Sequence, residues 1–80
     1  MMNEMTQPGF YYTSKGCFVA KTSPFSGKFH NVYIPMLDVY SVDSWLNGEK
    51  IQHAMSYLSP DQREYVKTGI TPEEWDAKFA

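Results

Sequence analysis

The chain has 80 residues, of which 42% are hydrophobic and 16% aromatic, and its formal net charge is −2 at pH 7. An intrinsically disordered segment would be less hydrophobic, and a protein that binds nucleic acid by neutralising phosphates would carry more positive charge. A domain of this size buries only roughly 60–65% of the surface of its unfolded chain, which excludes a large internal active site.

The N-terminus and the cysteine content indicate a soluble protein in a reducing compartment. Cys17 is the only cysteine, so it has no partner for an internal disulfide. Residues 1–8 lack the basic and apolar regions of a signal peptide and are expected to be flexible, and no stretch reaches membrane-spanning length. We therefore expect a cytoplasmic protein with no membrane partner.

Residues 9–36 are expected to be β-rich and to begin with a hairpin. Aromatic and β-branched residues at 9–13 and 17–21 flank Ser14-Lys15-Gly16, a three-residue loop in which Gly16 is expected to be left-handed. In that register one face of the hairpin carries Phe10, Tyr12, Phe18 and Ala20. The other face carries Tyr11, Thr13, Cys17, Val19 and Lys21.

A third strand is expected from about residue 30 to residue 36, after a loop of turn-forming residues at 22–28. Val32, Ile34 and Met36 alternate along this strand and are predicted to point inward. Pro35 cannot donate a backbone hydrogen bond, so the strand is expected to lie at an edge of the sheet or to end early.

Residues 41–80 are expected to be helical. A short helix is predicted over 41–46, closed by Asn47-Gly48. Ile51, Ala54, Met55 and Leu58 then recur at helical spacing and predict one apolar stripe.

Two further helix starts share one pattern. Ser59-Pro60-Asp61-Gln62 and Thr71-Pro72-Glu73-Glu74 each place a hydroxyl at the N-cap, proline at the first helical position and an acceptor side chain at the third. This is the capping box, in which the hydroxyl and the Gln or Glu each satisfy a free backbone N–H. The whole pattern predicts one α+β domain over residues 1–80, a small antiparallel sheet packed by three or four short helices.

The C-terminal half resembles a known kind of module. Trp45-Leu46-x-Gly48-Glu49-x-Ile51-Gln52-x-Ala54-Met55, then Leu58-Ser59-Pro60-Asp61-x-Arg63-Glu64, then Thr68-Gly69-Ile70-Thr71-Pro72-Glu73-Glu74-Trp75-Asp76 is similar to a module of small uncharacterised proteins encoded by bacteriophages. The resemblance covers the chain from Trp45 onward, 36 of its 80 residues, and implies a phage product that acts in the cytoplasm of a bacterial host. It supplies no catalytic residues.

The residues that could carry catalysis or bind a metal have a structural explanation. Cys17, His30 and His53 do not lie at the spacing of metal ligands or of a thiol–imidazole pair. Glu73 and Glu74 occupy the first turn of a helix, where the helix dipole and capping favour carboxylates. We therefore expect no enzyme, no cofactor and no metal site.

A protein-binding surface is the function that we expect. A few short helices can cover only one face of the sheet, which leaves apolar side chains on the other face. The residues expected to bind a partner are Tyr11, Val19, Lys21 and Tyr33. The expected partner is a host protein that belongs to a defence or nucleic-acid-processing machine. The chain is expected to inhibit that machine.

Two alternatives stay open. Aromatic residues and lysines of the sheet could bind single-stranded nucleic acid, although residues 41–80 carry seven acidic side chains against four basic ones and would oppose it. A second copy of the chain could instead cover the apolar face and form a homodimer.

Overall fold

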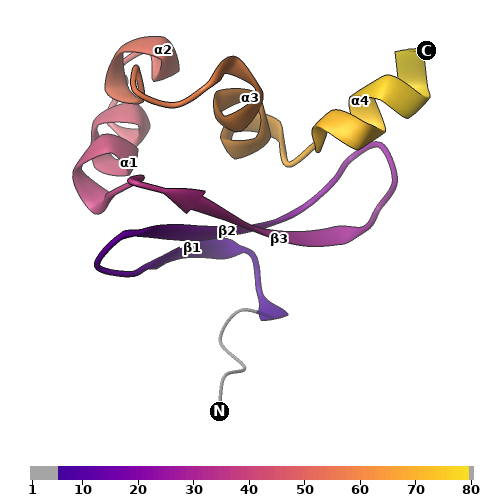
Figure 1. Cartoon of the computed structure of the whole chain (residues 1–80), viewed down its shortest axis with the longest axis horizontal. Coiled ribbons are helices and arrows are strands. Elements are labelled where there is room, and N and C mark those ends of the chain that lie inside the picture. The colour runs from indigo at the N-terminus through magenta and orange to yellow at the C-terminus, as the bar shows by residue number, and fades with distance from the viewer. Residues whose placement is uncertain (1–5, 80) are drawn as a thin grey trace.

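A computed structural model of the chain describes residues 6–79 and shows an α+β fold, which confirms the predicted class. A three-stranded antiparallel sheet has the order β1 (Gly9–Tyr12), β2 (Gly16–Thr22) and β3 (Phe29–Pro35). The helices α1 (Val39–Leu46), α2 (Ile51–Ala54), α3 (Pro60–Thr68) and α4 (Pro72–Phe79) follow in sequence. All four helices lie on the same side of the sheet, as Figure 1 shows. Residues 1–5, for which we expected flexibility, lie outside the described residues.

The turn between β1 and β2 is shorter than predicted. Thr13 N donates to the carbonyl of Gly16 at 2.8 Å, and the Thr13 hydroxyl accepts from the backbone N–H groups of Gly16 and Lys15. The tip is therefore only Ser14 and Lys15, and Tyr12 pairs with Cys17. Gly16 does not have a positive φ, so the expected left-handed conformation is wrong.

The shorter turn moves the register by one residue. Tyr11 pairs with Phe18 and Phe10 pairs with Val19, so the predicted division of β2 between the two faces is wrong. Side chains alternate along a strand, and a one-residue shift therefore sends every β2 side chain to the opposite face.

The hydrophobic core lies between the sheet and the helices. The sheet face toward the helices, which we call the inner face, contributes Cys17, Val19 and Ile34. The segments that follow the sheet contribute Leu37, Val42, Met55, Leu58, Tyr65 and Val66. Phe10 and Val32 are partly buried against this core, so the predicted inward orientation of Val32 is confirmed.

Met36 does not continue the inward alternation of β3. Its φ is 72° and its side chain is 70% exposed. The chain turns away from the sheet at Met36, and the following Leu37 is buried in the core instead. β3 is an edge strand that ends at Pro35, as the proline predicted.

The predicted apolar stripe is buried as expected but does not lie on one helix. α2 ends at Ala54 because Met55 leaves the helical conformation at φ −124° and ψ 45°. Met55 and Leu58 are nevertheless buried in the core. The guanidinium of Arg63 donates to the carbonyls of Met55 and Leu58, at 3.4 and 2.6 Å, where the helix is interrupted. The Met55 carbonyl also accepts from Leu58 N at 3.1 Å.

Both predicted capping boxes are present. The Ser59 hydroxyl accepts from Gln62 N at 3.1 Å, and the Gln62 side chain accepts from Ser59 N at 2.9 Å. Thr71 and Glu74 repeat this exchange at 3.3 and 3.1 Å. Tyr65 of α3 then ties the helices to the sheet, because its buried hydroxyl donates to the carbonyl of Val19 at 2.8 Å.

Candidate binding surface on the outer face of the sheet

The sheet face opposite the helices, which we call the outer face, carries a row of three aromatic rings. Tyr11 of β1 pairs with Phe18 of β2, and Phe18 pairs with Tyr33 of β3. The rings of Phe18 and Tyr33 are 4.8 Å apart between centroids. Tyr11 and Phe18 are partly exposed and Tyr33 is 39% exposed. This aromatic row crosses the full width of the sheet.

The two tyrosines lie over glycines. A Cβ atom on Gly16 would fall 2.6 Å from the Tyr33 hydroxyl oxygen, and one on Gly9 would fall 3.5 Å from the Tyr11 hydroxyl oxygen. The Tyr11 hydroxyl also donates to the carbonyl of Gln7 at 2.7 Å. Rings that pack over glycine are held in place, so the surface that they present is ordered before any partner binds.

The outer face has no charge on its strands. Alternation from the aromatic row assigns the following strand residues to it: Gly9, Tyr11, Gly16, Phe18, Ala20, Thr22, Phe29, Asn31, Tyr33 and Pro35. None of these described residues is Asp, Glu, Lys, Arg or His. Depletion of charge together with enrichment of Tyr and Phe is the composition of an interface core.

Two of the four predicted binding residues lie elsewhere. Val19 is fully buried on the inner face, so its expected place beside Tyr11 is wrong. Lys21 is also on the inner face, where its Cβ lies 3.0 Å from the position that a Cβ on Gly69 would occupy. Burial lowers the pKa of the Lys21 ammonium group. Tyr11 and Tyr33 do share the outer face.

Sequence reasoning missed Phe18 and Phe29 as outer-face residues. Phe18 lies at the centre of the aromatic row, and Phe29 is 41% exposed at the start of β3. The signal available in the sequence was Thr13, whose hydroxyl can close a two-residue turn by accepting from the backbone. With the turn placed on Ser14 and Lys15, the register follows and Phe18 faces outward.

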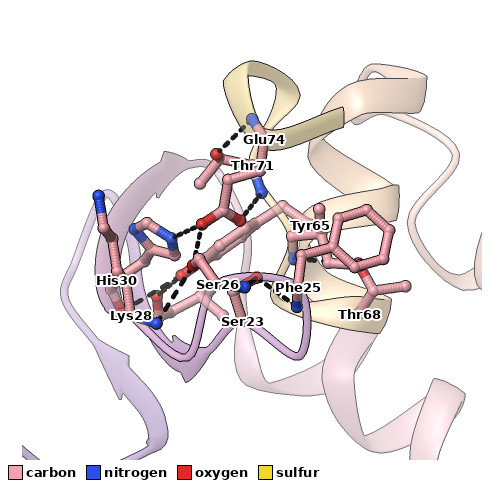
Figure 2. Close-up of polar contacts among 11 residues, drawn as sticks. Ser23, Phe25, Ser26, Lys28, His30, Tyr65, Thr68, Thr71 and Glu74 are labelled. Atoms are coloured by element: carbon pink, nitrogen blue, oxygen red, sulfur yellow. Dashed lines mark hydrogen bonds and ion pairs between the residues drawn. The ribbon is translucent and has the colours of Figure 1, made fainter. Parts of the chain in front are cut away.

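The polar network at the other end of the sheet is centred on Glu74. Figure 2 shows its carboxylate between the β2–β3 loop and the start of α4. One carboxylate oxygen accepts from the Ser26 hydroxyl at 2.5 Å and lies 2.7 Å from His30 Nε2, and the other accepts from Thr71 N. The hydrogen bond from Ser26, with those from His30 and Thr71, lowers the pKa of Glu74 to about 2.

This network is not a catalytic triad. In a triad the histidine lies between the nucleophile and the acid, and here the carboxylate itself contacts both Ser26 and His30. The Ser26 hydroxyl donates to a carboxylate whose pKa is about 2, which is too weak a base to activate it. The arrangement instead fastens the loop between β2 and β3 to α4.

The other candidate reactive groups are also held structurally. Cys17 is completely buried, and burial raises the pKa of its thiol. Residues 6–79 contain no group of three or more His, Cys, Asp or Glu side chains placed to hold a metal ion. No helix of this described part is both long and apolar enough to cross a membrane.

Comparisons with protein families, with curated proteins and with solved structures find no match to this chain. The likeness to the bacteriophage module therefore stays a prediction from the sequence.

Proposed function

We propose that the chain is a small protein-binding protein that uses the outer face of its sheet. The observation that carries this proposal is the aromatic row, Tyr11–Phe18–Tyr33, on an uncharged face that no helix covers. Aromatic side chains provide large contact areas with few rotatable bonds, and they dominate the binding energy of many protein interfaces. The row is wide enough to present three neighbouring rings to one partner.

The resemblance to phage-encoded proteins supplies the proposed context. The partner is a protein of the bacterial host, and the chain acts in the host cytoplasm as an inhibitor of a defence or nucleic-acid-processing machine. A rigid domain without enzymatic machinery can act in this way by occupying a surface that the host protein needs.

Binding of single-stranded nucleic acid is the second candidate, because exposed rings on a sheet can stack on unpaired bases. The distribution of lysines favours the protein partner. Lys21 lies on the inner face, and Lys15 and Lys28 lie in the loops at the ends of β2 and β3. A nucleic-acid platform would need cations along the row to neutralise phosphates.

The test is capture from bacterial lysate followed by titration of the captured protein. Tyr11→Ala should weaken binding by about 1–3 kcal/mol with the fold intact, as should Tyr33→Ala. Tyr40→Ala is the matched control, because Tyr40 is 78% exposed on α1, on the helical side of the sheet. Equal loss with Tyr40→Ala, or no loss with Tyr11→Ala, would remove the outer face as the binding surface.

Two further outcomes separate the alternatives. Capture that disappears after nuclease treatment would favour nucleic acid. A concentration-dependent dimer in sedimentation, abolished by Tyr11→Ala, would assign the outer face to a second copy of the chain.

A further inference from the structure

A trough runs beside the free edge of β3, on the other side of the strand from β2. One hollow of about 270 Å³ is lined by Val32, Tyr33 and Ile34 of β3 together with Tyr65, Pro72 and the first turns of α3 and α4. Val32 and Ile34 belong to the inner face and Tyr33 to the outer face, so this hollow lies at the edge of the strand. A second hollow of about 440 Å³ shares Asp61 and Pro72 with it but is lined by residues of α3 and α4 alone, so only the first hollow borders β3.

The sides of the trough are acidic. Asp61 and Glu73 border the first hollow, and Asp61, Glu64 and Asp76 border the second. No basic residue lines either hollow. Four carboxylates therefore lie together in a chain whose whole net charge is only −2.

No capping hydrogen bond and no ion pair is found for these four carboxylates in the described part of the chain. Asp61 and Glu73 are exposed and stand beside the capping boxes without belonging to them, because Gln62 and Glu74 make the reciprocal hydrogen bonds. Within residues 6–79 the ion pair found is the one between His30 and Glu74. Each of the four carboxylates is thus without a cationic partner in this part of the chain.

We propose that β3 accepts an extended, basic segment of a partner protein as a fourth strand. An edge strand presents backbone N–H and C=O groups that an added strand can pair with, and alternate side chains then provide specificity. β3 has seven residues against four in β1, the opposite edge, so it offers the longer site.

The lining of the trough defines the sequence of that segment. Side chains on its inner side reach over Tyr65 and Pro72 toward Asp61 and Glu73, a path that suits the aliphatic stem and cationic head of Lys or Arg. Side chains on its outer side lie next to Tyr33 and are apolar. The segment therefore alternates basic and apolar residues.

Charge complementarity argues against a second copy of the chain at this edge. Pairing of two β3 strands would bring the carboxylates of both copies together. The β3 edge shares Tyr33 with the outer face, but this inference does not depend on the function proposed for the outer face.

The test is to titrate a short capped peptide of alternating lysine and valine into the full chain. Binding is followed by NMR of the backbone amides of the chain. Amides of β3 and of the first turns of α3 and α4 should shift. The double variant Asp61→Asn/Glu73→Gln should weaken binding by about tenfold, since each exposed charge pair contributes only modestly to affinity. Asp43→Asn/Glu49→Gln, which removes two exposed carboxylates away from the trough, should leave binding unchanged.

Two control peptides make the result decisive. Replacing valine by proline keeps the charge and removes backbone donors, and replacing lysine by glutamate keeps the strand and reverses the charge; neither should bind. Equal binding by either control peptide, or binding unaffected by the loss of Asp61 and Glu73, would overturn the proposal. So would the same amide shifts with Ca²⁺ alone, because the carboxylates would then form a metal site. Tyr11→Ala should not alter the titration, whereas it should weaken binding to the outer face.

Discussion

The hydroxyl oxygen of Tyr33 lies 2.6 Å from the position that a Cβ atom on Gly16 would occupy. The tyrosine ring thus fills the space that a side chain on Gly16 would need. Glycine at the start of β2 serves close packing rather than an unusual backbone angle, and it keeps one end of the aromatic row flat against the sheet.

Gly16→Ala is expected to lower the free energy of unfolding by about 1–3 kcal/mol, the usual cost of forcing an extra carbon into a filled space. The new Cβ would also meet the carbonyl oxygen of Ile34 at 2.6 Å, and backbone cannot easily move away. Gly9→Ala is the matched control, because its nearest neighbour is at the ordinary contact distance of 3.5 Å. Urea denaturation of both variants measures the difference, and equal effects would show that Tyr33 does not restrict Gly16.

Cys17→Ser is expected to fold but to be less stable by about 1–3 kcal/mol, because it places a hydroxyl among apolar side chains of the core. Cys17→Ala removes the sulfur without adding a polar group and should be less destabilising. Denaturation curves compare the two variants, and elemental analysis of the purified wild-type protein should find no stoichiometric zinc. A loss of bound zinc in Cys17→Ser would contradict the structural role.

The contribution of Glu74 to the stability of the fold should depend on pH. Its pKa is lowered in the folded protein from 4.5 to about 2, so the folded state favours the ionised carboxylate. The contribution is complete above the unfolded-state pKa and disappears as the pH falls from about 4.5 to about 2.

Glu74→Gln tests this dependence. The wild type should be the more stable protein at neutral pH, and the difference in thermal midpoint should shrink between pH 5 and pH 2. Glu73→Gln, the neighbouring exposed carboxylate, is the control and should show no comparable acid dependence. A constant difference across that range would mean that the hydrogen bonds of Glu74 do not depend on its charge.

Trp75→Phe is expected to change the free energy of unfolding by less than about 1 kcal/mol. The indole ring contacts Phe25 and Phe79, with centroids 5.1 and 5.3 Å apart, and a phenyl ring can keep these contacts. The indole Nε1 is buried with no acceptor among the described residues, and such a donor costs about 1–3 kcal/mol that phenylalanine would not incur.

Trp75→Ala serves as the comparison, because it removes the ring itself and should cost about 2 kcal/mol or more. Chemical denaturation gives both values. If phenylalanine were as destabilising as alanine, the indole nitrogen would have to be hydrogen-bonded in solution.

Several features of the fold could be predicted because they depend on residues three or four apart. The boxes at Ser59 and Thr71 are such features, since a hydroxyl, a proline and an acceptor side chain define a helix start without reference to the rest of the protein. The inward orientation of Val32 and Ile34 also follows from alternation within one strand. These local rules were enough to predict an α+β domain.

The candidate binding surface depended on one hydrogen-bonded turn. The sequence showed that the rings belonged to a sheet but not which of them shared a face, because a turn shorter by one residue exchanges the two faces of β2. The Thr13 hydroxyl decided this point, and it moved Phe18 outward and Val19 and Lys21 inward.

The amino-acid sequence by itself therefore determined where the helices capped by Ser59 and Thr71 begin and which kind of fold they join. Only the tertiary structure decided that α2 stops at Ala54, where Arg63 donates to the carbonyls of the following segment, and that Glu74 meets His30, 44 residues away in the chain. Local hydrogen bonds compete only with water and a few neighbouring groups, so short patterns predict them. Long-range contacts depend on how every element packs against the core, and no short pattern contains that information.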